Sequence, residues 1–204
     1  MKRRFVVLAT FAVLACCCSI SRANILSLVS TNDGDGAIAC EGYFDSVNAV
    51  LTIEGPQYWS PGHMLGTITT DTTNDPSLTL RTTVDNDTGI DWTGYHVNVY
   101  MTNTFTISNA QVFTPGDWSI AITQQPIFNG TQWEGQIDLA GGTVITNGTL
   151  NALDFSYKIT FSGGTQYAFT QEMIVVPEPG TAGLVTLSGL LLGWFTFVRG
   201  TRRT

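Results

Sequence analysis

The chain has 204 residues, with 9 Lys and Arg against 16 Asp and Glu, and its formal net charge is −7. Most bases lie at the two ends, so that residues 24–176 contain two bases and fifteen acids and have a formal charge of −13. Nucleic acids and anionic lipid headgroups are bound by Lys and Arg, and this composition excludes both as partners of the central region.

The first 23 residues have the pattern of a secretory signal peptide. Lys2, Arg3 and Arg4 precede an uncharged apolar run over residues 5–18. Small residues follow at positions −3 and −1 of a cut between Ala23 and Asn24. Charge, length and cut site together predict export, with a mature chain that begins at Asn24.

A second reading of this segment is a lipoprotein signal. Val13-Leu14-Ala15-Cys16 is a partial lipobox, and cleavage before Cys16 would leave a diacylated cysteine at the new N-terminus. Leu14 at position −2 fits that signal poorly, and Cys17 and Cys18 have no role in it. We therefore favour the cut after Ala23.

Residues 24–174 are predicted to form one acidic all-β domain, because apolar and polar residues alternate with period two and no helical period is visible. One polar face per strand is typical of antiparallel sheets. We expect an antiparallel two-sheet β-sandwich, jelly-roll or immunoglobulin-like, with nine to eleven strands; a barrel is the second choice. The clearest inward-facing sets are Tyr95, Val97, Val99 and Met101, then Phe155, Tyr157, Ile159 and Phe161.

Glycine pairs and Asn-Gly pairs mark the expected turns. Asn129-Gly130, Gly141-Gly142, Asn147-Gly148 and Gly163-Gly164 each lie between strand-like runs. Tight hairpins need residues that tolerate positive φ, so these four pairs are predicted to close hairpins. Cys40 is the single cysteine left after the signal peptide, and its apolar neighbours predict a small core residue rather than a nucleophile.

Three carboxylates, those of Asp85, Asp87 and Asp91, lie within one short segment and are a candidate Ca²⁺ site. Their spacing does not match an EF-hand, and Asp and Asn also favour ordinary turns without a metal. The acidic segment 32–36 is interpreted as a turn before a strand.

Tyr58 and Trp59 lie in a proline-flanked loop and are the aromatic pair best placed for a ligand, for example the apolar face of a sugar. Simple loop packing is the competing explanation. His63 is expected in a loop and His96 on a polar strand face, and neither has a catalytic motif beside it. We therefore expect no enzymatic activity; a hydrolase would need two carboxylates across a groove, which sequence cannot place.

The last 28 residues contain three parts in a fixed order. Pro177-Glu178-Pro179 is followed by an uncharged apolar run over residues 180–198 and then by Arg199, Arg202 and Arg203. Nineteen helical residues span about 28 Å, close to the thickness of the hydrocarbon core of a bilayer. The run is predicted to be a transmembrane helix, with the arginines as a stop on the cytoplasmic side.

This order resembles the PEP-CTERM sorting signal of bacterial envelope proteins, here over residues 175–204. The resemblance implies that Pro177, Glu178 and Pro179 are recognised by exosortase, a membrane transpeptidase, while the helix holds the chain in the inner membrane until processing. It also implies a final place at the cell surface or outside the cell, with a structural or adhesive role in exopolysaccharide or biofilm matrix. An ordinary anchor that is never cut is the alternative, as are a carbohydrate- or calcium-binding module and a secreted hydrolase for the domain itself.

Overall fold

A computed structural model describes residues 22–180. The apolar run of the predicted signal peptide, the predicted membrane helix beyond Gly180, and Arg199, Arg202 and Arg203 lie outside the described residues. Within residues 22–180, no helix is long and apolar enough to cross a bilayer.

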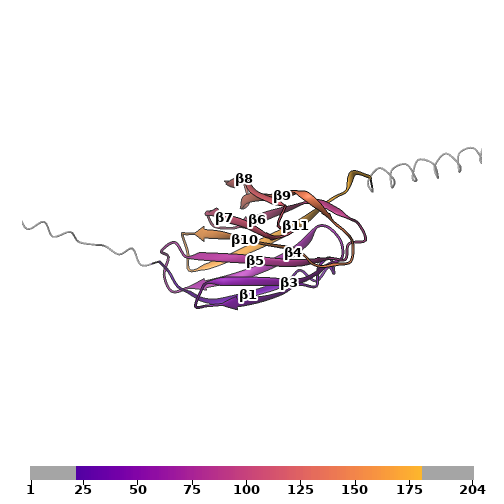
Figure 1. Cartoon of the computed structure of the whole chain (residues 1–204). Helices are drawn as coiled ribbons and strands as arrows, with labels where there is room; N and C mark the ends of the chain where they lie inside the picture. The colour runs from indigo at the N-terminus through magenta and orange to yellow at the C-terminus, as the bar shows by residue number, and fades with distance from the viewer. Residues whose placement is uncertain (1–21, 181–204) are drawn as a thin grey trace, which may run out of the picture.

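Two β-sheets pack face to face, which confirms the predicted all-β two-sheet sandwich (Figure 1). One sheet has six strands, in the order β1 (Ile25–Asn32), β4 (Gly62–Thr70), β11 (Gln166–Pro177), β6 (Trp92–Met101), β9 (Trp133–Ile145) and β8 (Ser119–Phe128). The other has five, in the order β2 (Glu41–Asp45), β3 (Val50–Gln57), β5 (Ser77–Asn86), β10 (Thr149–Phe161) and β7 (Phe105–Thr114).

The core lies between the sheets, and the period-two pattern predicts which side chains fill it. Tyr95, Val97, Val99 and Met101 of β6 are all buried, as are the four alternating apolar residues of β10, from Phe155 to Phe161. Side chains from the two inner faces form one continuous cluster, as expected for a sandwich of twisted sheets.

The sheets are not wholly antiparallel, and this corrects the prediction. Strands β3 and β5 pair in parallel, with Leu51 opposite Leu80 and Ile53 opposite Thr82. The chain between them passes through β4, which belongs to the other sheet. Because the chain crosses to the second sheet and returns, β5 runs in the same direction as β3.

Of the four predicted hairpin turns, Asn129-Gly130 joins two hydrogen-bonded strands, β8 and β9. Asn147-Gly148 and Gly163-Gly164 instead connect strands of different sheets, and Gly141-Gly142 lies inside β9. Gly130, Gly141, Gly142, Gly148 and Gly163 do have positive φ. Glycine therefore marks where the backbone turns, whereas the partner of each strand depends on which sheet buries its apolar face.

Candidate functional site

The Pro177–Pro179 motif starts inside the sheet and leaves it after one residue. Pro177 is the last residue of β11, and its carbonyl oxygen accepts a hydrogen bond from Thr93 Oγ1 at 3.3 Å. The Glu178 amide donates to the Asp91 carbonyl oxygen at 3.0 Å, whereas Pro179 is exposed. Strand β11 thus continues three residues beyond residue 174, the predicted end of the domain.

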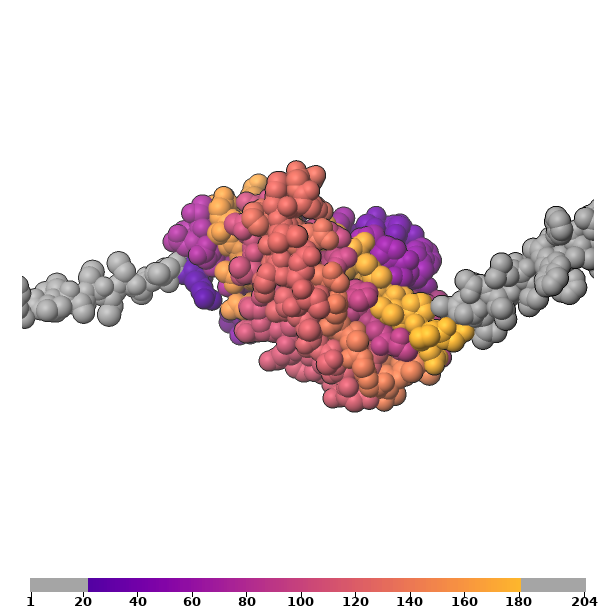
Figure 2. Space-filling view, turned by 90° about the horizontal axis from the view of Figure 1, so that it is seen from above, coloured from indigo at the N-terminus to yellow at the C-terminus, as the bar shows by residue number. Residues whose placement is uncertain are grey.

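Strand β11 is a central strand of the six-stranded sheet, hydrogen-bonded to β4 on one side and to β6 on the other. Figure 2 shows its end, coloured yellow, at the surface where the described chain leaves the domain. Any segment that follows Gly180 is therefore attached to the interior of a sheet rather than to an edge strand.

Residues at the predicted signal cleavage site are held against the loop after β4. The Ala23 amide donates to the Asn74 carbonyl oxygen at 2.7 Å. The Asn24 side-chain and backbone N–H groups donate to the two oxygens of Asp71, each at 2.8 Å. These hydrogen bonds lower the pKa of the Asp71 carboxyl, since they favour its charged form.

The three carboxylates of the candidate Ca²⁺ loop do not converge in the described part of the chain. Asp85 accepts the Asn151 amide hydrogen at 2.6 Å, and Asp91 accepts that of Asn147 at 2.8 Å. Asp87 is exposed. Asp91 therefore holds the β9–β10 connection, and Asp85 holds the start of β10. Both aspartates support the local backbone structure.

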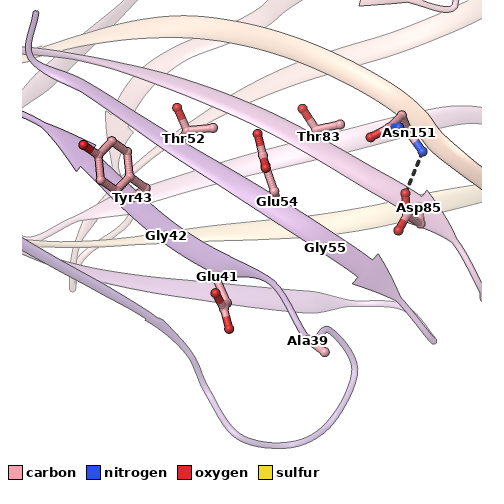
Figure 3. Close-up of a pocket in the computed structure, with 10 residues that line it drawn as sticks. All are labelled: Ala39, Glu41, Gly42, Tyr43, Thr52, Glu54, Gly55, Thr83, Asp85 and Asn151. Carbon is pink, nitrogen blue, oxygen red and sulfur yellow. Dashed lines mark hydrogen bonds between the residues drawn. The ribbon is translucent and has the colours of Figure 1, made fainter.

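An open groove of about 800 Å³ lies over β2, β3 and β5 (Figure 3). Its lining contains three carboxylates and no base; the residues are Ala39, Glu41, Gly42, Tyr43, Thr52, Glu54, Gly55, Thr83, Asp85 and Asn151. Glu41 and Glu54 are directly opposite one another on paired strands. Such a surface can accept hydrogen bonds from hydroxyl groups or attract cations.

The sequence does not mark Glu41, Glu54 or Tyr43 as site residues. No local motif marks them, and the strand register that places the two glutamates opposite each other is decided by pairing. Tyr43 is 73% exposed and offers the groove an aromatic ring. Glu41 and Tyr43 alternate along one short strand, which predicts that they share a face. The sequence does not show which strand lies beside them.

Tyr58 and Trp59, the aromatic pair predicted for a ligand, are 42% and 51% exposed in the β3–β4 connection. They do not line the groove of Figure 3. Both backbone amides donate to the Ala37 carbonyl oxygen, at 2.8 and 3.3 Å. A β-carbon on Gly36 would lie 3.2 Å from the Trp59 ring, so this loop packs on the segment that follows β1.

His63 lies in strand β4 rather than in a loop, which corrects the sequence interpretation. The residues before it, Pro61 and Gly62, suggested a loop, but Gly62 is needed because a β-carbon there would overlap Ile38. His63 Nδ1 is 3.0 Å from Asp33 Oδ2, and its Nε2 is 3.4 Å from Glu172 Oε1. His96 is on a polar strand face, as predicted, with Nδ1 2.7 Å from Asp138 Oδ1.

Cys40 is buried with a free thiol, as its sequence context predicts. Burial, followed by the negative charge of Asp85, raises the pKa of this thiol to about 12. A thiol that stays protonated at neutral pH is a poor nucleophile, so Cys40 is a packing residue.

No family model matches the chain, and no curated protein matches it. Among solved structures, the chain is similar to TmCBM61 in complex with β-1,4-galactotriose, at 7% identity over 76% of this chain and 91% of that one. The TM-score is 0.17, and a likeness this weak carries no argument about fold or function.

Proposed function

We propose that the protein is an exported cell-envelope protein that exosortase sorts through a PEP-CTERM tail. Residues 180–198 would anchor it in the inner membrane before processing, with Arg199, Arg202 and Arg203 as the cytoplasmic stop. After processing it would reside at the cell surface or outside the cell, as a structural or adhesive component of exopolysaccharide or biofilm matrix. The observation that carries this proposal is the order Pro-Glu-Pro, apolar run, arginine cluster at residues 177–203.

The end of β11 supports this proposal in one respect. Pro177 is hydrogen-bonded to β6 and Glu178 to the segment before β6, while Pro179 is exposed. A cut beyond Pro179 would leave every described strand complete. For the domain, we propose a jelly-roll or immunoglobulin-like sandwich. We also propose that an N-terminal signal peptide is cut between Ala23 and Asn24.

The intact mass of the protein isolated from its native host tests the sorting proposal. Loss of the mass beyond the Pro-Glu-Pro motif is expected, together with loss of residues 1–23. Glu178→Ala should prevent tail removal, whereas Asp87→Ala, at an exposed acid in another loop, should not. A mature protein that keeps residues 180–204 would be an ordinary membrane anchor, and added diacylglycerol at Cys16 would support the lipoprotein signal instead.

A second candidate function is glycan binding in the groove of Figure 3. Its support is a lining rich in hydrogen-bond acceptors, next to the exposed ring of Tyr43. Soluble polysaccharide from the host matrix should raise the melting temperature of the full-length protein, because a ligand selective for the native state stabilises it. Glu54→Gln and Tyr43→Ala should remove this rise, and Trp59→Ala should not. Ca²⁺ titrated alone tests whether the carboxylates bind the cation instead.

We propose a binding role for this groove rather than a catalytic one. Cys40 is a buried thiol with a raised pKa. Each histidine is already paired with a carboxylate: His63 with Asp33 and Glu172, and His96 with Asp138. We therefore assign none of these three residues a catalytic role in the groove. Glu41 and Glu54 are nevertheless neighbours, as a hydrolase would require. Release of reducing ends from the matrix polysaccharide, abolished by Glu54→Gln, would establish hydrolysis and contradict this assignment.

A further inference from the structure

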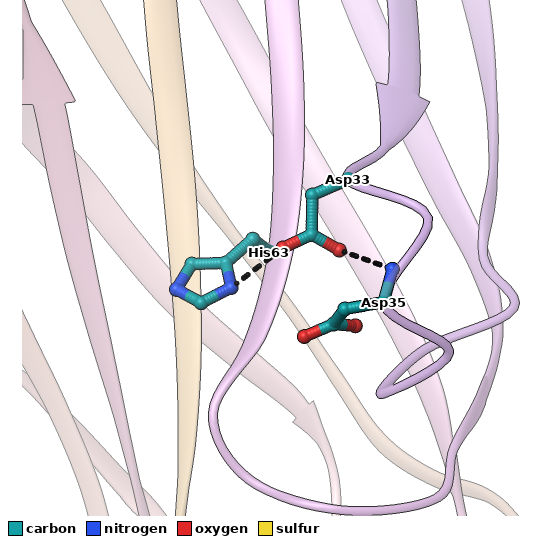
Figure 4. Close-up of side chains that lie close together, drawn as sticks. All are labelled: Asp33, Asp35 and His63. Carbon is teal, nitrogen blue, oxygen red and sulfur yellow. Dashed lines mark hydrogen bonds and ion pairs between the residues drawn. The ribbon is translucent and has the colours of Figure 1, made fainter.

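We infer that Asp33, Asp35 and His63 form a binding site for a divalent transition-metal ion, with Zn²⁺ as its best representative. Asp33 and Asp35 lie in the loop after β1, and His63 is the second residue of β4. One donor atom from each residue lies within 4.8 Å of the other two (Figure 4).

Glu172 sets the orientation of that ring. Its Oε1 lies 3.4 Å from His63 Nε2, while its Oε2 accepts hydrogen bonds from Asn98 Nδ2 at 2.7 Å and from Tyr100 OH at 2.8 Å. A carboxylate fixed in this way holds the imidazole by its Nε2 edge, so that the Nδ1 edge faces Asp33 in the loop after β1. A histidine held by a carboxylate through one nitrogen commonly binds a metal through the other.

The environment of His63 Nδ1 also points to a cation. This atom is buried, although the His63 side chain as a whole is 27% exposed, and it lies within ion-pair distance of Asp33 Oδ2, at 3.0 Å, without forming an aligned hydrogen bond. A lone pair facing a carboxylate oxygen at this distance is repulsive unless a cation lies between them. Two ligands that are each about 2.0–2.2 Å from a shared ion are themselves roughly 3.0–3.5 Å apart, so the separation fits joint coordination.

The other histidine shows what an ordinary pair looks like in this protein. His96 Nδ1 makes an aligned hydrogen bond of 2.7 Å with Asp138 Oδ1, and Gln136 donates to the same oxygen. Neither His96 nor Asp138 belongs to a group of three converging donors among residues 22–180. The pair of His96 and Asp138 is therefore the matched control.

The donor set indicates the class of ion. One imidazole nitrogen suits Zn²⁺ and its first-row neighbours, whereas Ca²⁺ prefers oxygen ligands alone. Two carboxylates balance the charge of a divalent ion, and the charge of −13 over residues 24–176 attracts cations. Asp35 is exposed, and its Oδ1 accepts the Ala37 amide hydrogen at 2.7 Å, which fixes the carboxylate close to the other two ligands.

A bound ion would fasten the loop after β1 to strand β4. Gly36, next to Asp35, lies so near Trp59 that a β-carbon on it would be 3.2 Å from the ring. Coordination would thus order the loop on which Trp59 packs, and tryptophan fluorescence should report the binding.

The test uses the full-length protein without a polyhistidine tag, in detergent and after treatment with EDTA. Titration with Zn²⁺ in a calorimeter should give one ion per chain. At a hundredfold excess over Kd the melting temperature should rise by roughly 5–10 °C. His63→Gln and Asp35→Asn should each weaken Zn²⁺ binding at least tenfold, and Glu172→Gln should weaken it about tenfold or more through loss of ring orientation. His96→Gln should bind like the wild type.

Three results would overturn the proposal. The first is the absence of stoichiometric Zn²⁺ binding, which would mean that the histidine is an imidazolium paired with two carboxylates. The second is equal binding by wild type and His63→Gln, which would indicate diffuse attraction to an acidic surface. The third is tighter binding of Ca²⁺ than of Zn²⁺ with no effect of His63→Gln, which would indicate an oxygen-only site. If His63→Gln does not fold, Asp35→Asn decides, since Asp35 is exposed in a loop.

Discussion

Individual buried polar residues connect the two sheets across the core. Tyr157 of β10 donates a hydrogen bond to Gln171 Oε1 of β11 at 2.7 Å, and Gln171 Nε2 donates to Thr82 Oγ1 of β5 at 3.1 Å. Tyr95 of β6 likewise donates to Gln57 Oε1 of β3 at 2.6 Å. All five side chains are buried, so each bond satisfies groups that water cannot reach.

Removing one hydroxyl group from this network should destabilise the domain. Tyr157→Phe leaves the Gln171 carbonyl oxygen without its donor, and we expect a loss of about 1–3 kcal/mol in the free energy of unfolding. Urea unfolding followed by tryptophan fluorescence measures it. Tyr43→Phe, at a residue that is 73% exposed, should change stability by less than about 0.5 kcal/mol. Equal stability of the two variants would mean that water replaces the missing donor.

At the scale of the elements, the pairing of β4 with β11 depends on a glycine. Gly66 is opposite Phe169, and a β-carbon on Gly66 would overlap the Phe169 ring. Gly66→Ala should therefore cost about 1–3 kcal/mol through overpacking, measured as a lower midpoint of urea unfolding. Gly116→Ala is the control, because that position has open space around it. An unchanged midpoint for Gly66→Ala would show that Phe169 can move aside without cost.

The bulge in β9 is a second feature that one neighbouring side chain stabilises. The pairing of β9 with β6 jumps from Ala140 to Ile145, and Gly141 and Gly142 have positive φ. Asp117 Oδ2 accepts hydrogen bonds from the Thr143 amide at 2.6 Å and the Thr143 hydroxyl at 2.8 Å. These bonds lower the pKa of the Asp117 carboxyl from its ordinary value, because they favour its charged form.

The lowered pKa fixes the direction of a pH effect. A carboxyl that binds protons less readily when folded stabilises the native state above its unfolded pKa, and this contribution is lost as pH falls. Asp117→Asn should thus lower the melting temperature at pH 7, and the difference from wild type should shrink below about pH 4 and vanish at lower pH. Melting curves from pH 7 to pH 2.5 test this, with Asp87→Asn as the control for charge. A difference that does not depend on pH would assign the effect to shape alone.

Across the whole molecule, negative charge is poorly compensated. Residues 24–176 have a formal charge of −13, and Arg81 is already paired with Asp154 at 2.7 Å. Like charges on one small domain oppose the compact state, and dissolved ions screen them.

Salt should therefore stabilise the protein. Raising NaCl from 20 to 200 mM is expected to add about 1 kcal/mol, or roughly 2–4 °C in melting temperature. KCl at the same concentrations should act equally, because screening does not depend on the identity of the ion. A melting temperature that falls with salt would show that attractive ion pairs dominate instead.

The sequence by itself determined the fold class and most of the core. The alternation of apolar and polar residues along β6 and β10 identified the buried faces, because side chains on a strand point alternately to its two sides. The apolar neighbours of Cys40 predicted a core residue, and this is confirmed. The three-part C-terminal tail, on which the sorting proposal is based, is also a feature of the sequence alone.

Tertiary structure alone decided which strands pair and which distant side chains meet. The parallel pair β3 and β5, the Glu41–Glu54 register and the convergence of His63 with Asp33 and Glu172 all join residues from separate strands and loops. Local patterns report how each strand distributes its side chains between two faces. The choice of neighbour depends on burying all those faces at once, and that is a property of the whole chain.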